Sequence, residues 1–262
     1  MDILSATVVV GIIGLFIGVA LVAAGKKFHV EIDPREAAVR ERLPGNNCGA
    51  CGYAGCDAVA TAIVKGETAV NACPVCSADA VSAIGDVMGV EITATARRVA
   101  FVHCAGDCIH SPIRSNYIGI ADCRAASASN VFARACDYGC LGYGSCVKVC
   151  NYSAISVKDG VARVDTERCV GCGMCASVCP RHLIEILPAG HMMAIQCASH
   201  ERGATMRKTC TAGCLGCSLC VRQCDNDAVS VEENLARIDP ERCIGCGMCA
   251  EKCPAKVIRY IL

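Results

Sequence analysis

The sequence predicts an α+β protein in which a single N-terminal transmembrane helix precedes several small cysteine-rich modules. Three observations lead to this prediction: an uncharged apolar run opens the chain, 26 of its 262 residues are cysteine, and residues 140–180 recur at 214–254 with a constant offset. Aromatic residues make up 4% of the chain and tryptophan is absent, so anchors for a large hydrocarbon core are scarce. Something other than a large apolar core must hold these modules together.

These features divide the chain into five parts. We expect a transmembrane helix in residues 1–27, a four-cysteine module in 28–90, a linking region with a short strand in 91–132, and two related domains in 133–190 and 191–262.

The apolar run at the N-terminus predicts a helix that crosses a membrane. No charged residue occurs from Ile3 to Gly25, and at 1.5 Å per residue this stretch would cover about 34 Å, enough for a hydrocarbon core. A cleavable signal peptide is the alternative, but Asp2 replaces the usual basic start and the run is too long for a signal core. Lys26 and Lys27 follow at once, so the positive-inside rule predicts a single-pass protein of the cytoplasmic membrane with its modules on the cytoplasmic side.

The balance of charge and the number of cysteines exclude several classes of protein. The 25 acidic and 25 basic residues cancel, so no basic excess indicates nucleic acid as a partner. Disulfide frameworks belong to short secreted chains, and zinc sites usually present separated pairs of cysteines rather than closely spaced triplets. Iron–sulfur clusters are the explanation that remains.

Two runs have the cysteine spacing of a bacterial ferredoxin. They read Cys169-Val-Gly-Cys172-Gly-Met-Cys175-Ala-Ser-Val-Cys179-Pro180 and Cys243-Ile-Gly-Cys246-Gly-Met-Cys249-Ala-Glu-Lys-Cys253-Pro254. In such runs three thiolates bind one 4Fe–4S cluster and the fourth binds the neighbouring cluster. The last domain is therefore predicted to hold two clusters. Their ligands are Cys214, Cys217, Cys220 and Cys253 for one, and Cys243, Cys246, Cys249 and Cys224 for the other.

The first ferredoxin domain departs from this pattern at one ligand. When the two copies are aligned, Tyr143 stands where the last domain has Cys217. Cys136, just upstream, is the predicted replacement; a three-iron cluster or a ligand other than cysteine is the alternative. Cys210, which aligns with Cys136, is then expected to be a free thiol. The predicted sets are Cys136, Cys140, Cys146 and Cys179 for one cluster, and Cys169, Cys172, Cys175 and Cys150 for its neighbour.

A small iron–sulfur module is predicted before the two tandem bacterial-type ferredoxin domains. Glycines separate its cysteines, so backbone amides can approach and hydrogen-bond cluster sulfurs. One 4Fe–4S cluster is assigned to Cys48, Cys51, Cys56 and Cys73. A zinc site is the alternative, and Cys76 is an alternative fourth ligand. The remaining cysteines either form a further metal or redox site or are buried free thiols; they are Cys104, Cys108, Cys123 and Cys197.

Capping and turn signals predict the short elements around these cysteines. Asp33 is expected to cap a helix that begins at Pro34, and Gly66 and Gly89 are expected to end two more. The predicted helices are residues 34–42, 57–65 and 77–88, the predicted strand is 99–102, and the predicted hairpins are 154–164 and 228–238.

Taken together, the N-terminal helix, the Cys48-x2-Cys51-x4-Cys56-x16-Cys73 module, the Ile120-Ala-Asp-Cys123 element and the tandem ferredoxin domains resemble the B subunit of the Rnf electron-transport complex, in its anaerobe form. The resemblance implies a membrane-bound complex that oxidises reduced ferredoxin, reduces NAD and couples this reaction to pumping sodium ions or protons. It also implies that NAD and flavin bind to other subunits. The sequence agrees, because it offers no convincing Gly-x-Gly-x-x-Gly loop and no constellation of catalytic acid, base or nucleophile.

The twenty predicted ligands make five 4Fe–4S clusters, which together form a path for electrons. We expect soluble ferredoxin to donate electrons to the distal ferredoxin domains, other membrane and peripheral subunits as partners, and no nucleic acid. Two other functions remain open. One is a polyferredoxin subunit of a different membrane oxidoreductase, such as a hydrogenase or a reductive activator, and the other is an iron–sulfur store or assembly scaffold.

Overall fold

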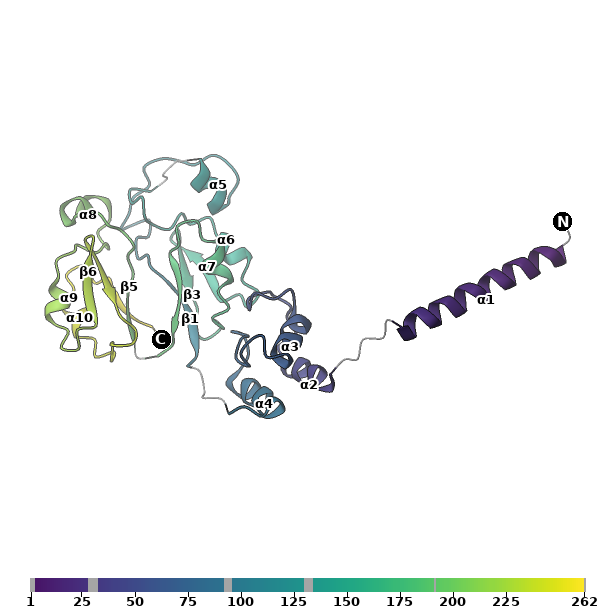
Figure 1. The fold of residues 1–262 in the computed structure, drawn as a ribbon. Helices are drawn as coiled ribbons and strands as arrows, with labels where there is room; N and C mark the ends of the chain where they lie inside the picture. The colour runs from purple at the N-terminus through teal and green to yellow at the C-terminus, as the bar shows by residue number, and fades with distance from the viewer. Residues whose placement is uncertain (1–2, 28–32, 92–95, 130–133, 191, 262) are drawn as a thin grey trace.

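The computed structural model describes residues 3–27, 33–91, 96–129, 134–190 and 192–261. Figure 1 shows helix α1 standing apart from a helical module and from a larger body of short strands and helices. The helices are α1 Ile3–Lys27, α2 Pro34–Arg42, α3 Cys56–Val64, α4 Ala78–Met88, α5 Cys123–Ala128, α6 Ser145–Lys148, α7 Met174–Val178, α8 Gly203–Thr209, α9 Leu219–Arg222 and α10 Met248–Glu251. The strands are β1 Arg98–Val102, β2 Ile155–Lys158, β3 Val161–Val164, β4 Ile184–Pro188, β5 Met192–Ile195, β6 Val229–Glu232, β7 Leu235–Ile238 and β8 Ile258–Ile261.

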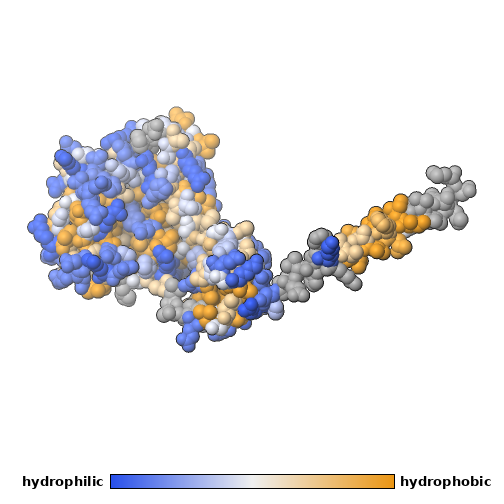
Figure 2. Space-filling model, viewed as in Figure 1, coloured by the Kyte–Doolittle hydropathy of each residue, from blue (hydrophilic) through white to orange (hydrophobic). Residues whose placement is uncertain are grey.

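Helix α1 covers the apolar run at the N-terminus. The side chains of Leu15, Phe16 and Leu21 on this helix are 71%, 75% and 67% exposed, and Figure 2 shows an apolar surface along its described part. A helix that is apolar all round is typical of a membrane span or of a deeply buried core helix. Within the described residues, however, no helix is found that has both the length and the apolarity needed to cross a membrane.

Helices α2, α3 and α4 form the module around the first group of cysteines. The predicted cap of α2 is confirmed, because the Asp33 carboxylate accepts a hydrogen bond from Arg35 N at 2.9 Å. Ser77 caps α4, and its hydroxyl accepts a hydrogen bond from Ala80 N at 3.2 Å. Gly89 ends α4 in the left-handed conformation. The core of this module combines apolar side chains with two cysteines; it contains Val39, Val59, Ile63, Ile84, Cys56 and Cys73.

Two hairpins at equivalent positions confirm the predicted duplication. Strand β2 pairs antiparallel with β3, and β6 pairs antiparallel with β7. The register is the same in both copies, because Ile155 faces Val164 in the first hairpin and Val229 faces Ile238 in the second.

Two further sheets include three strands, β4, β5 and β8, that the sequence does not predict. Strand β1, expected in the linking region, pairs antiparallel with β4, and β5 pairs antiparallel with β8. Runs of four or five residues carry too weak a periodic signal for β4, β5 and β8 to be assigned without their partners. The body therefore consists of two related units, each with a hairpin and a second two-stranded sheet. We call residues 98–188 unit 1 and residues 192–261 unit 2.

A glycine in each unit lies directly against the hairpin turn. A Cβ atom on Gly142 would lie 2.6 Å from the carbonyl oxygen of Gly160, and one on Gly216 would lie 2.8 Å from that of Asn234. Both glycines also have positive φ angles, +78° and +61°. No other residue fits this close approach between the cysteine loop and the hairpin.

Cysteines occupy much of the core of each unit. Buried apolar side chains of unit 1 surround Cys104, Cys146, Cys169 and Cys175, and those of unit 2 surround Cys197, Cys214, Cys220, Cys249 and Cys253. Met192, Ala194 and Ile261 of unit 2 belong to the core of unit 1, so the two cores are in contact.

Candidate iron–sulfur centres

Unit 2 contains two cavities lined by cysteines from separate loops. One is lined by Cys214, Cys217, Cys220 and Cys253, and the other by Cys224, Cys243, Cys246 and Cys249. In each cavity three cysteines come from one run and the fourth from the other run, as crossed ligation requires. These groups are the two sets predicted from spacing, and we propose their role as ligands below.

One cavity of unit 1 is lined by the corresponding predicted set, which is Cys150, Cys169, Cys172 and Cys175. Backbone amides point at two of these sulfurs: Ala100 N lies 3.3 Å from Cys169 Sγ, and Ala154 N lies 3.3 Å from Cys150 Sγ. Ala100 belongs to β1, so the strand expected in the linking region contributes to this site. Such amide donors stabilise thiolate ligands and lower their charge density.

The second cavity of unit 1 has a lining that differs from the predicted ligand set. It is lined by Cys123, Cys140, Cys146 and Cys179. Cys136, the predicted fourth member, is not among its lining residues, and Cys123 lies there instead. Cys123 is therefore the candidate that we propose below for the ligand position that Tyr143 leaves open.

Hydrogen bonds explain how a cysteine from a distant segment reaches this cavity. The Asp122 carboxylate caps α5 by accepting from Arg124 N at 2.8 Å, and it also accepts from the Ser145 hydroxyl at 2.7 Å. The Ser145 oxygen in turn accepts from Cys123 N at 2.8 Å. Because Ser145 is buried next to Cys146, these bonds hold Cys123 beside the loop that supplies the other ligands. In the sequence, Asp122 before Cys123 indicates a helix cap, but this local pattern does not indicate which loop the helix packs against.

In the helical module, burial favours Cys73 over Cys76 as the fourth ligand. Cys73 is 9% exposed and belongs to the same core as Cys56, whereas Cys76 is partly buried and packs against that core. The Asn47 side chain accepts from Cys56 N at 2.8 Å and shapes the loop that carries the other cysteines.

The donor set suits iron–sulfur clusters. Burial raises the pKa of Cys146 to about 12 and that of Cys175 and Cys220 to about 11, so these thiols resist ionisation unless a cation binds them. Within the described ranges, no group of three or more His, Cys, Asp or Glu side chains has the spacing for a single metal ion. A 4Fe–4S cluster spaces its ligands more widely than one ion does, because irons and sulfides lie between them.

Comparison with known proteins agrees with this chemistry. A family model described as a putative Fe-S cluster matches residues 43–75, and one described as a 4Fe-4S binding domain matches residues 162–185 and 236–259. These matches indicate that the chain binds 4Fe–4S clusters.

Relatives match most of the chain. It is 41% identical to the B subunit of the Na(+)-translocating ferredoxin:NAD(+) oxidoreductase complex of Acetobacterium woodii, over 89% of this chain and 71% of that protein. It is 37% identical to the B subunit of the ion-translocating oxidoreductase complex of Methanosarcina acetivorans, over 94% of each. The chain belongs to the family of Rnf B subunits. The B subunit of the proton-translocating ferredoxin:NAD(+) oxidoreductase complex of Clostridium ljungdahlii is a third relative, 39% identical over 88% of this chain and 82% of its own length. The predicted family resemblance is thus confirmed.

In this member of the Rnf family, the helical module contacts unit 1 beside two cysteine groups. The Asn46 amide donates to the Tyr152 hydroxyl at 2.6 Å. Burial raises the pKa of Tyr152, and the charges of Cys48 and Cys172 add to this effect. Tyr152 also lines the cavity that contains Cys172, so the helical module meets unit 1 at this cavity.

Proposed function

We propose that this chain is the electron-transfer B subunit of a membrane-bound complex that oxidises reduced ferredoxin, reduces NAD and couples the reaction to translocation of sodium ions or protons. One observation carries the proposal: relatives named as the B subunits of ion-translocating oxidoreductase complexes are 37% to 41% identical over 88% to 94% of this chain. The other subunits of the complex would be its partners, and soluble ferredoxin would be its electron donor.

The cysteine groups support five 4Fe–4S sites. Bound clusters supply one-electron transfer, and this chain's residues hold them, surround them with apolar side chains and direct backbone amides at their ligands. The proposed sets are those predicted from the sequence, except that Cys123 replaces Cys136. They are Cys48, Cys51, Cys56 and Cys73; Cys150, Cys169, Cys172 and Cys175; Cys123, Cys140, Cys146 and Cys179; Cys214, Cys217, Cys220 and Cys253; and Cys224, Cys243, Cys246 and Cys249.

The exposure of individual cysteines supports a direction of electron flow. Cys217 and Cys246 in unit 2 are exposed, which suits a site where soluble ferredoxin docks. At the other end, Tyr152 connects unit 1 with the helical module. Electrons would enter at unit 2, cross unit 1 and leave through the module toward the membrane subunits.

Membrane attachment through α1 is part of this proposal. Its apolar side chains are exposed in the isolated chain, and burial in lipid would remove them from water. The two lysines that end the apolar run favour the cytoplasmic side for the cysteine-rich parts. The complex would thus keep its iron–sulfur sites in the compartment where reduced ferredoxin is available.

Anaerobic purification of the intact complex through a tag on this chain tests the function. We expect other subunits to copurify and the complex to reduce NAD with reduced ferredoxin. Cys246→Ser, at the exposed end, should lower this rate by about tenfold or more, whereas Cys108→Ser, outside the proposed sets, should not. An unchanged rate in Cys246→Ser would rule out entry at unit 2, and copurification with hydrogenase subunits instead would refute the assignment.

A further inference from the structure

Unit 1 contains an insertion that unit 2 lacks. Cys136 lies 34 residues after the end of β1, whereas its counterpart Cys210 lies 15 residues after the end of β5. We call the described residues of this segment, 106–129 and 134, the insertion. Unit 2 forms its hairpin and both of its cysteine-lined cavities without such a segment. The extra residues are therefore not required for the scaffold of a ferredoxin unit.

The insertion exposes four isoleucines, which we call the isoleucine patch. Ile109, Ile113, Ile118 and Ile120 are 83%, 57%, 95% and 74% exposed. Among the described residues outside α1, no other large apolar side chain is as exposed as the first, third and fourth of these. Figure 2 shows apolar residues over the loop beside α5. A group of exposed apolar side chains of this kind marks a surface that another protein covers.

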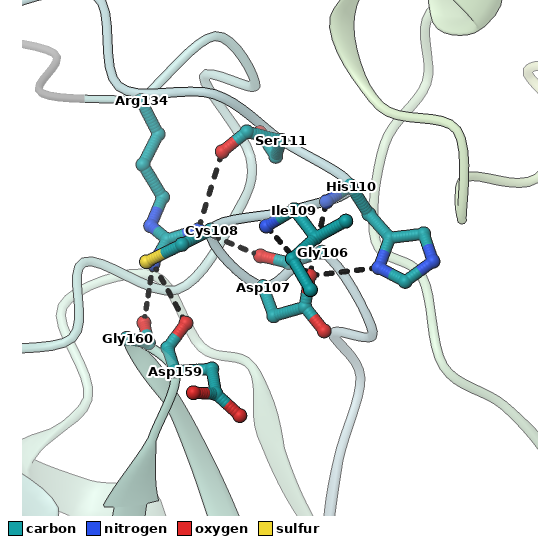
Figure 3. Close-up of polar contacts among 9 residues, drawn as sticks. All are labelled: Gly106, Asp107, Cys108, Ile109, His110, Ser111, Arg134, Asp159 and Gly160. Carbon is teal, nitrogen blue, oxygen red and sulfur yellow. Dashed lines mark hydrogen bonds and ion pairs between the residues drawn. The ribbon is translucent and has the colours of Figure 1, made fainter.

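Hydrogen bonds hold the first two isoleucines at the β2–β3 turn. The Cys108 amide donates to the Asp159 carbonyl oxygen at 3.0 Å, so the isoleucine that follows lies beside this turn. Ile113 forms an antiparallel bridge with Arg134. The guanidinium group of that arginine donates to the Gly160 carbonyl oxygen at 2.9 Å, and Figure 3 shows it between the insertion and the turn.

An aromatic contact connects the other two isoleucines with the same turn. The Tyr117 ring packs edge-on against the Tyr143 ring, with 5.3 Å between their centroids. Tyr143 follows Gly142, the glycine that lies against the β2–β3 turn. The last two isoleucines of the patch are one and three residues after Tyr117. All four side chains therefore gather around one hairpin turn of unit 1.

The first loop of the patch is fixed without any partner. The Asp107 carboxylate accepts from Ile109 N and His110 N, each at 3.0 Å, and from the His110 ring at 2.7 Å. Arg134, which is 6% exposed, donates to the Gly106 carbonyl oxygen at 2.9 Å. Figure 3 shows these contacts around the loop. Because the loop is already ordered by its own hydrogen bonds, a partner that covers it would lose little affinity to ordering it.

The exposed charges beside the patch are mainly basic. Arg114 and Arg124 belong to the insertion and are exposed. Lys148 reaches the insertion from α6, where its ammonium group donates to the Ala121 carbonyl oxygen at 3.0 Å. Both carboxylates of the insertion are partly buried and accept from backbone amides, which leaves Asp159 at the turn as the exposed acid beside these three bases. A partner with acidic side chains around an apolar centre would complement this surface.

The insertion also contributes to a proposed cluster site. Cys123 belongs to it and lines a cavity together with Cys140. A protein seated on the patch would therefore lie next to the segment that supplies one ligand of this site. Permanent interfaces are more apolar than transient ones, so the exposed isoleucines favour a permanently bound neighbour. Soluble ferredoxin binds transiently, and the proposed function places it at unit 2.

We propose that the isoleucine patch is the surface through which unit 1 docks against another subunit of the same complex, one that presents an apolar centre with an acidic rim. The inference rests on the proposed function, because it takes the occupant from that complex. This contact would add a second point of attachment to the one at α1. It would also keep the segment that contains Cys123 against a neighbouring subunit.

Anaerobic purification through a tag on the full-length chain tests the surface. Ile118→Glu together with Ile120→Glu places two acids in the patch, and we expect the yield of at least one copurified subunit to fall by about tenfold or more. Ile118→Leu together with Ile120→Leu is the matched control and should retain every subunit, because leucine keeps the surface apolar. Both variants should have the iron content of the unaltered chain, since neither position is a proposed ligand.

A charge reversal at the rim provides a second test. Arg114→Glu should lower the yield of the same subunit by about threefold, because like charges would then face each other across the interface. Higher salt should reduce the difference from the unaltered chain, since the rim is exposed to solvent.

Two results would overturn the docking surface. One is a full set of subunits in the glutamate double variant, even if soluble ferredoxin then reduces it more slowly. The other is an isolated chain that is dimeric by light scattering in detergent and becomes monomeric in this variant, because a second copy would then be the occupant. If the double variant loses its iron by misfolding, Arg114→Glu decides. The proposed function fails separately, if the assembled complex does not reduce NAD with reduced ferredoxin.

Discussion

Ser145 shows how one hydroxyl can place a distant cysteine beside a cavity. It donates to the Asp122 carboxylate and accepts from Cys123 N, so it joins the start of α5 to the loop that carries Cys146. The Ser145 hydroxyl is also the main cause that holds the pKa of Asp122 below its ordinary value, so the carboxylate stays an acceptor. Cys123 is therefore placed by a local network and not by its distance from the other ligands in the sequence.

Replacement of Cys123 tests the revised ligand set. We expect Cys123→Ser to lose about four irons per chain, because three cysteines remain at a site that needs four ligands. Cys108→Ser, an exposed cysteine in no proposed set, should lose none. Iron and sulfide analysis after anaerobic reconstitution measures the difference. Full iron content in Cys123→Ser would exclude this residue as a ligand.

A second substitution should restore the lost site. Tyr143 occupies the position of Cys217 in the duplicated unit. The double variant Cys123→Ser with Tyr143→Cys is therefore expected to recover about four irons per chain, since it recreates the spacing of unit 2. Tyr143→Phe in the Cys123→Ser background is the control and should remain deficient. Equal iron content in both double variants would contradict the equivalence of the two positions.

At the scale of elements, the close contact between each cysteine loop and its hairpin supports the cluster sites. Gly142 and Gly216 bring their loops against the turns at Gly160 and Asn234. Strand β1 contributes in a different way, because its Ala100 amide points at a sulfur of unit 1. Secondary structure here orients loops and amides, and the short strands also supply many of the buried apolar side chains of both cores.

Alanine at Gly216 should weaken unit 2 more than alanine at a glycine with open space around it. Gly216→Ala incurs the left-handed backbone cost of about 1–2 kcal/mol and a contact with the Asn234 carbonyl that adds about 1–3 kcal/mol. Gly190→Ala incurs only the first, because its φ is +90° and no atom lies within 4 Å. The two variants are compared by the denaturant concentration at which half of the cluster absorbance is lost, and we expect a lower concentration for Gly216→Ala. Equal midpoints would show that the loop can move away from the turn.

At the scale of the whole molecule, the cysteine groups form a series from the exposed end of unit 2 to the module that follows α1. Tyr152 connects the module with unit 1, and the core of unit 1 includes Met192, Ala194 and Ile261 of unit 2. Apolar α1 lies beyond the helical module, which is the end where electrons would leave under the proposed function. Under that proposal, α1 would hold this end of the path at a membrane.

A charge in α1 tests the membrane attachment. Ile17→Asp places a carboxylate in the apolar helix at a cost of about 2.5–3.5 kcal/mol for insertion. We expect more of this variant in the soluble fraction than of Gly18→Ala, whose added methyl group meets no atom within 4 Å. Fractionation of cells that express the chain without its partner subunits measures this. Equal membrane content in both variants would argue against insertion of α1.

The sequence alone determined the features that depend on neighbouring residues. The capped helices, the two hairpins and the cysteine triplets each follow from signals within a few residues, because caps, tight turns and cluster loops are local structures. Tertiary structure decided that Cys123 lies beside Cys140, Cys146 and Cys179, and that β1 pairs with β4. These depend on segments distant in the chain that meet only when strands pair and loops dock, and no local pattern encodes that meeting.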